Sequence, residues 1–209
     1  MKKMSKWIED NLVDVSPFYS SYLKKRQATD SSLGFYQWRV PSTPSPCEDF
    51  ALKFGSHGQN LKGFLIIPIR TYEGDILGFE SRALIKDGSK FVKQYRTKQA
   101  SSNPYFLGSK KCFDVLWNGW GDIWIVEGVF DFTALEKVLP SCDAVISTLR
   151  AGIDQVSLNM IVRHYTPSST VYLAYDNDEA GRSKSQELQK KLTSLGVRSV
   201  VWKYRGKDP

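Results

Sequence analysis

The stretches Ile123-Trp-Ile-Val-Glu127-Gly128-Val-Phe-Asp131 and Val171-Tyr-Leu-Ala-Tyr-Asp176-Asn-Asp178-Glu-Ala-Gly181 decide the fold. Each is an apolar run that ends in acidic residues, and each is followed by a helical pattern. In a parallel sheet the carboxyl ends of the strands share one edge, where ligands bind. We therefore expect Glu127, Asp176 and Asp178 to meet at that edge.

These carboxylates suit magnesium, which takes a few carboxylate oxygens together with water and phosphate oxygens. Two such ions, about 3.5–4 Å apart, can hold an attacking hydroxyl and a leaving oxygen in line. Asp131 joins the cluster if its helix begins early. An Asp-x-Asp sequence is also a frequent turn and helix N-cap. The metal interpretation therefore depends on both acidic segments following strands.

The segment from residue 121 onward alternates short apolar runs with helical patterns, which indicates a parallel sheet flanked by helices, an α/β fold. We expect strands at 123–126, 144–146, 171–174 and 197–202, and helices at 131–138, 154–164 and 179–195, the last closed by Gly196.

The preceding segment has a different character, and we place the domain boundary between residues 1–120 and 121–209. Apolar runs at 64–69, 76–85 and 90–96, separated by turn signals, predict an antiparallel meander. Helical patterns fill residues 1–30, and prolines indicate a loop at 40–48. The first part is thus expected to be a small α+β subdomain.

The net charge of +7 is concentrated in one region, because residues 82–111 hold eight basic residues and one acidic residue. Such an excess attracts a polyanion, although a solvated basic face would have the same composition. The three cysteines are isolated, which excludes a zinc ribbon and a disulfide framework. No membrane-spanning run or signal peptide is evident, so we expect a cytoplasmic protein.

The chain resembles the TOPRIM fold of bacterial-type primases, topoisomerases and ribonuclease M5. The resemblance lies in the order of its elements, which is strand, Glu127-Gly128, Asp131, strand, helix, strand and Asp176-x-Asp178-x-Ala-Gly181. Upstream, the segments 61–70 and 74–82 look like the basic subdomain that precedes TOPRIM in bacterial and phage primases. Tyr204-Arg-Gly-Lys-Asp208-Pro is similar to the final acidic motif of that family. The resemblance covers residues 18–209.

The resemblance implies a primase catalytic core, of phage type, that makes short RNA primers on single-stranded DNA by magnesium-dependent nucleotidyl transfer. Manganese could substitute for magnesium. Glu127, Asp176 and Asp178 would hold the metal, supported by Asp131 and Asp208. Template and ribonucleoside triphosphates would contact six basic residues, namely Lys62, Arg70, Arg82, Lys93, Arg96 and Lys98. A replicative helicase would be a partner, and a phage-encoded protein would act in the host cytoplasm.

Two alternatives remain open at this point. One is a TOPRIM nuclease resembling ribonuclease M5, which lacks the module at 64–96. The other is an accessory protein that binds nucleic acid without synthesis, since a family lysine is replaced at Gly108 or Ser109 and a family glycine by Arg150. A topoisomerase is disfavoured because the chain is too short for a separate domain with a transesterifying tyrosine. Tyr95, Tyr105, Phe106 and Trp117 are candidates for stacking on bases.

Overall fold

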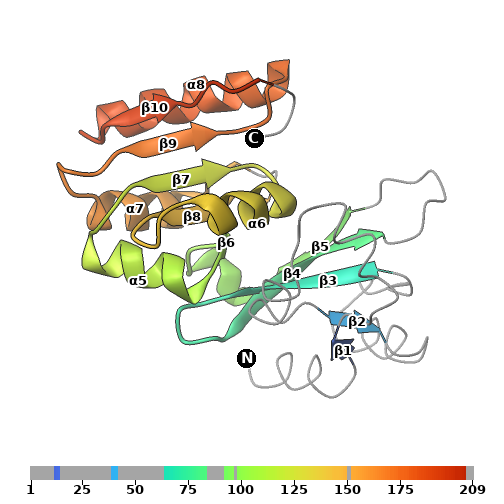
Figure 1. Ribbon diagram of the computed structural model, residues 1–209. Helices are drawn as coiled ribbons and strands as arrows, with labels where there is room; N and C mark the ends of the chain where they lie inside the picture. Colours follow the sequence, from blue (N-terminus) through green and yellow to red (C-terminus); the bar gives the residue numbers. More distant parts are fainter. Residues whose placement is uncertain are drawn as a thin grey trace. The chain divides into compact units, whose positions relative to one another are not determined.

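The computed structural model describes residues 12–14, 39–41, 64–83, 92–96, 98–149 and 152–205. The chain forms two compact units, residues 1–100 and 101–209 (Figure 1). The sequence placed the boundary after residue 120. The division comes earlier because β6 (Leu107–Gly108) pairs with β8 (Ala144–Ser147), and α5 (Lys110–Asn118) packs on β8 as well.

The first unit contains a five-stranded sheet in the order β1-β2-β3-β4-β5, with all neighbours antiparallel. The meander predicted over residues 64–96 is confirmed. The central strand of this meander, β4, is buried on both faces. Leu77 and Phe79 share one face, Glu80 lies on the other because side chains alternate along a strand, and all three are buried. The strands are β1 (Leu12–Asp14), β2 (Arg39–Pro41), β3 (Phe64–Arg70), β4 (Ile76–Ala83) and β5 (Val92–Arg96).

The prediction of helix at residues 12–14 is wrong, because these residues form β1 and pair with β2. β2 also extends into the start of the segment expected to be a loop. Pairing with a neighbouring strand overrides a weak 3.6-residue pattern in so short a segment. The rest of the helical prediction for residues 1–30 lies outside the described residues.

The second unit contains the predicted parallel sheet, in the order β10-β9-β7-β8-β6 (Figure 1). The first four strands run parallel, and β6 adds an antiparallel edge next to β8. β7 (Ile123–Val126) lies between β8 and β9 (Val171–Ala174), with β10 (Ser199–Val201) beyond β9. Val126 is therefore paired with both Ser147 and Ala174.

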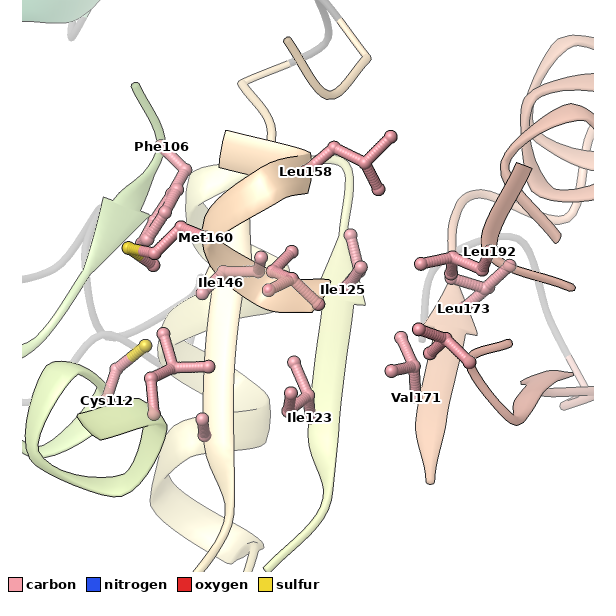
Figure 2. Packing of buried hydrophobic residues seen from close by; sticks show 14 of the residues in the cluster. Phe106, Cys112, Ile123, Ile125, Ile146, Leu158, Met160, Val171, Leu173 and Leu192 are labelled. Atoms are coloured by element: carbon pink, nitrogen blue, oxygen red, sulfur yellow. The ribbon is translucent and has the colours of Figure 1, made fainter. Parts of the chain in front are cut away.

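Helices cover both faces of this sheet. One core joins Ile123, Ile125 and Ile146 to α5, α7 (Gln155–His164) and α8 (Glu179–Ser194) (Figure 2). Phe132 of α6 (Val129–Val138) is buried outside that core, and α6 packs on β8, so α6 covers the opposite face. No helix among the described residues is long and apolar enough to cross a bilayer.

Contacts between aromatic rings attach the segment after β10 to the sheet. Trp124 stacks on Tyr172 at 4.3 Å between ring centroids, and Trp202 meets Trp124 edge-on at 5.2 Å. Tyr204 contacts Trp202 and donates a 2.7 Å hydrogen bond from its hydroxyl to the carbonyl oxygen of Tyr175. The chain beyond β10 is thus attached to the end of β9, beside the acidic segment.

Candidate functional site

The acidic segments follow two neighbouring strands. β7 and β9 are paired in parallel, and Val126 lies opposite Ala174 at their carboxyl ends. Glu127 is the next residue after β7, and Asp176 is two residues beyond Ala174. The backbone therefore brings both segments to the same edge of the sheet, as the sequence predicted.

Glu127 is held at its backbone and at its carboxylate. The Ser147 hydroxyl, at the end of β8, donates a 3.1 Å hydrogen bond to the carbonyl oxygen of Glu127. Lys184 Nζ of α8 lies 2.9 Å from Glu127 Oε1, and the two side chains are 34% and 17% exposed. A cation provided by the chain itself thus neutralises this carboxylate.

Asp178 is held by the helix that follows it. It is the N-cap of α8, and its Oδ1 accepts a 2.8 Å hydrogen bond from the backbone N–H of Gly181. Glycine is required at position 181, because a Cβ there would overlap the carbonyl oxygen of Asp176. The close approach of α8 to the strand end fixes the Asp176–Asp178 segment.

Asp131 has a local partner in the first turn of α6. Its Oδ2 accepts a 3.0 Å hydrogen bond from the backbone N–H of Gly128, the residue after Glu127. The helix begins at Val129, two residues earlier than predicted, because Gly128 takes the extended N-cap conformation. Asp131 thereby fixes the backbone next to Glu127.

Tyr175 is a buried, uncharged neighbour of Glu127. Burial raises the pKa of Tyr175 to about 12, the nearby Thr148 hydroxyl lowers it, and the negative charge of Glu127 raises it. The phenol therefore stays protonated at neutral pH, and the negative charge at this edge belongs to the carboxylates.

The donor set fits magnesium, because it consists of hard oxygen ligands at adjacent strand ends. Among the described residues, however, no group of three or more acidic, histidine or cysteine side chains is close enough to hold a metal ion. Glu127 is occupied by Lys184, and Asp178 by a helix N–H. Asp208 lies outside the described residues. The binding of an ion by Glu127, Asp131, Asp176, Asp178 and Asp208 therefore stays a prediction.

The candidate phosphate-binding residues belong to the first unit. Arg96, at the end of β5, is exposed, whereas Arg70 is half-buried and donates a 2.8 Å hydrogen bond to the carbonyl oxygen of Gly74 in the β3–β4 turn. Arg82 and Lys93 occupy β4 and β5, opposite Val92 and Ser81. Lys62 and the side chains of Arg82, Lys93 and Lys98 are outside the described part of the chain.

The aromatic candidates for base stacking are not equivalent. Tyr105 and Phe106 are buried core residues, 4% and 1% exposed. Trp117, at the end of α5, is 53% exposed and stacks on His164 at 4.8 Å. The side chain of Tyr95 is outside the described part of the chain. Trp117 is thus the described candidate with an accessible ring.

Sequence reasoning missed Lys184. Its partner Glu127 is 57 residues away along the chain, so no local pattern links the two side chains. The available signal was a lysine in the second turn of the helix that follows the acidic segment. Side chains on a helix lean toward its N-terminus, and here that end lies at the acidic edge.

Comparison with known proteins agrees with this geometry. Residues 124–209 match the family model described as Toprim-like. A curated DNA primase from Mycoplasma genitalium is 24% identical over 159 residues, which is 74% of this chain and 25% of that protein. The crystal structure of the Aquifex aeolicus primase, comprising its zinc-binding and RNA polymerase domains, has a TM-score of 0.72 at 21% identity and covers 93% of this chain and 51% of that one. The structure of a DnaG primase catalytic domain bound to ssDNA has a TM-score of 0.64 at 16% identity, covering 90% and 66%.

Residues 124–209 of the C-terminal unit thus match the Toprim-like model, and the resemblance of the fold to bacterial primase cores is confirmed. The likeness extends into the first unit, since the Aquifex structure covers 93% of the chain. The chain spans about a quarter of the length of the Mycoplasma genitalium primase it matches.

Proposed function

We propose that this chain is the catalytic core of a DNA primase, which synthesises short RNA primers on single-stranded DNA. The observation that carries the proposal is the pairing of β7 with β9, which brings Glu127 and the Asp176–Asp178 segment to one edge of a Toprim-like sheet. Support also comes from primase relatives and from the basic excess of residues 82–111.

The reaction joins two ribonucleotides. The 3′-hydroxyl oxygen of one nucleotide attacks the α-phosphorus of the next triphosphate, a new P–O ester bond forms, and the bond to the β-phosphate breaks. Pyrophosphate leaves, and the hydroxyl proton passes to solvent. Because the phosphoryl group gains negative charge in the transition state, catalysis depends on positioning and on positive charge at that point.

The carboxylates have separate duties in this proposal. Glu127, Asp176 and Asp178 hold magnesium, which supplies positive charge to the phosphate oxygens when it is bound. Asp131 positions Gly128 through its hydrogen bond, and Asp208 supports the acidic edge. Gly128 keeps side-chain bulk away from the position where phosphates approach.

The first unit supplies the template surface. Arg70, Arg82, Lys93, Arg96, Lys98 and Lys62 neutralise the phosphates of the template and of the incoming triphosphate. Binding should weaken as salt rises, because phosphate contacts release counterions. A salt-independent affinity for single-stranded DNA would count against this surface.

The proposal extends to the biological setting. A DnaG primase catalytic domain of similar fold binds ssDNA, which supports the same ligand here. The co-substrates are ribonucleoside triphosphates with magnesium or manganese, a replicative helicase is the partner, and the protein acts in the cytoplasm, that of the host if it is phage-encoded.

The alternative of a nuclease resembling ribonuclease M5 accounts for the second unit only. The primase interpretation is favoured because the likeness to primase structures covers the strands of the first unit as well. A binding protein without synthesis would show neither primers nor cleaved template, so the same assay separates the three.

The test uses Glu127→Gln, which removes the charge and keeps the size of the side chain. The wild-type protein should make short RNA products when it is supplied with single-stranded DNA, ribonucleotides and magnesium. The variant's rate of synthesis should be at least about 100-fold lower. Glu187→Gln is the matched control, because Glu187 is exposed on α8 and pairs with Lys191. Unchanged synthesis by Glu127→Gln would refute the site assignment.

A further inference from the structure

The Lys184–Glu127 pair is a contact between distant parts of the second unit. α8 is fixed by Gly181, which approaches the backbone of Asp176, and by Leu188 in the core. Lys184 lies three residues after Gly181 and four before Leu188, so it projects from the flank of the helix that meets the sheet. Its stem leans toward the start of α8, and Nζ reaches Glu127 Oε1 at 2.9 Å.

This pair differs from two other ion pairs in the second unit. Lys110–Asp114 and Lys191–Glu187 are neighbours four residues apart on one helix, and their side chains are 43–67% exposed. Glu127 is only 17% exposed and follows a buried strand. Water screens the first two pairs, whereas the Lys184–Glu127 pair has less contact with solvent.

Lys184 contacts a carboxylate oxygen that the proposed function assigns to a divalent ion. Glu127 Oε1 accepts a hydrogen bond from the Lys184 ammonium at 2.9 Å, so one positive charge already lies beside it. A divalent ion bound to the same carboxylate would bring two further positive charges close to that ammonium. Repulsion between the ammonium and the ion opposes metal binding at Glu127 while the pair is closed. Lysine suits an exchange with the metal, because its charge is compact and its four-carbon stem is flexible.

We propose that Lys184 is a built-in counter-ion that keeps Glu127 neutralised in the metal-free protein and competes with divalent cations for it. This inference rests on the proposed function, in which Glu127 is a metal ligand. Lys184 is thus a positioning residue that sets the cation concentration at which the site fills. Removal of its charge should tighten metal binding, whereas a lysine that merely orients Glu127 for the metal would weaken it when lost.

The experiment measures Mn²⁺ binding to the full chain without nucleotide, from the electron paramagnetic resonance signal of free Mn²⁺. Lys184→Gln should bind about three- to tenfold more tightly than wild type. Lys184→Arg, which keeps the charge, and Lys191→Gln, which removes a charge seven residues further along α8, should bind like wild type. Equal or weaker binding by Lys184→Gln would overturn the proposal.

Glu127→Gln separates this inference from the proposed function. If that variant binds Mn²⁺ like wild type, Glu127 is not a ligand and the proposed site fails. If it binds at least about tenfold more weakly while Lys184→Gln shows no gain, only the role of Lys184 fails.

A second measurement avoids dependence on the folding of Lys184→Gln. In wild-type protein with ¹⁵N-labelled lysine, the ammonium signal of Lys184 is identified by its loss in Lys184→Arg. Addition of Mg²⁺ should shift or broaden that signal as the pair opens, and leave the Lys191 signal in place. A Lys184 signal that stays constant at saturating Mg²⁺ would contradict the exchange.

Discussion

The two acidic segments of the second unit hold their carboxylates in different ways. After β7, Glu127 pairs with a lysine from another element, whereas after β9, Asp178 accepts from a backbone N–H of the helix it begins. The helices differ as well. α6 has ten residues, of which eight are buried or half-buried, and α8 is a 16-residue amphipathic helix whose opposite side is exposed.

This difference shows that one strand–acid–helix pattern can give two kinds of carboxylate. A lysine is a mobile cation that another cation can replace. A helix N–H is fixed by the backbone and uses one carboxylate oxygen permanently, which leaves the other for a further ligand. We therefore expect changes after β9 to affect folding most, and changes at Glu127 to affect metal binding and activity most.

Gly181→Ala should cause the largest loss of stability. The added Cβ overlaps the carbonyl oxygen of Asp176, so α8 must move away from the strand end. We expect a loss of about 3 kcal/mol in the free energy of unfolding, measured by chemical denaturation. Ser183→Ala, at an exposed position of the same helix, should stay within about 0.5 kcal/mol. Equal stability of the two variants would mean that α8 does not depend on this approach.

Glu136 tests the buried character of α6. Burial raises its pKa from 4.5 to about 7, and its Oε1 has no hydrogen-bond partner among the described residues. The folded state therefore binds more protons than the unfolded state between these values. Stability from this group is fully present below pH 4.5, falls as the pH rises to about 7, and is then constant.

Glu136→Gln should remove that slope and stabilise the protein above pH 7 by about 1–2 kcal/mol, after allowance for partial exposure. Denaturation at a series of pH values measures the effect. In Glu187→Gln, which changes an exposed carboxylate of α8, the slope should persist. A wild-type curve that rises through this range would contradict the assignment.

Substitutions at Asp178 can separate its role as helix N-cap from its proposed role as metal ligand. Asp178→Ala loses the N-cap hydrogen bond to Gly181 and should cost about 1 kcal/mol of unfolding free energy. Asp178→Asn keeps a cap acceptor and should be nearly as stable as wild type, yet it should bind Mn²⁺ more weakly because the charge is gone. If both variants were equally destabilised, the cap would not explain the stability.

Lys191→Ala should have the smallest effect. Lys191 and Glu187 form an exposed pair on α8, and water screens such pairs so that they contribute little to stability. Thermal unfolding at low and high salt measures the change, which should shrink further as salt screens the charges. A loss above about 1 kcal/mol would show that α8 is less tolerant on its exposed side than we infer.

The sequence was most informative where buried strands and helix caps impose a pattern. The apolar runs at 123–126 and 171–174 became β7 and β9 with the predicted bounds, and α8 begins at Glu179 as expected. Parallel pairing of these strands follows from their apolar character and from the helices between them. The strand order and the antiparallel β6 depend on contacts between distant segments, which no local pattern contains.

The placement of the two acidic segments at one edge of the sheet was predictable from the sequence, whereas the partners of their side chains were not. Strand ends give the positions of Glu127, Asp176 and Asp178, because chain direction alone brings them to one edge. The Lys184 contact depends on how far α8 leans over the sheet, which Gly181 and the core residues decide. The helix predicted at 12–14 failed because a three-residue strand is specified by its partner β2.

The most direct test of the account is diffraction from crystals soaked in Mn²⁺, with data collected at the manganese edge. We expect an anomalous peak within about 2.0–2.4 Å of oxygens from Glu127 and at least one of Asp176 and Asp178, with Lys184 moved away from Glu127. Full occupancy of Mn²⁺ elsewhere, with the Lys184–Glu127 pair still closed, would contradict it.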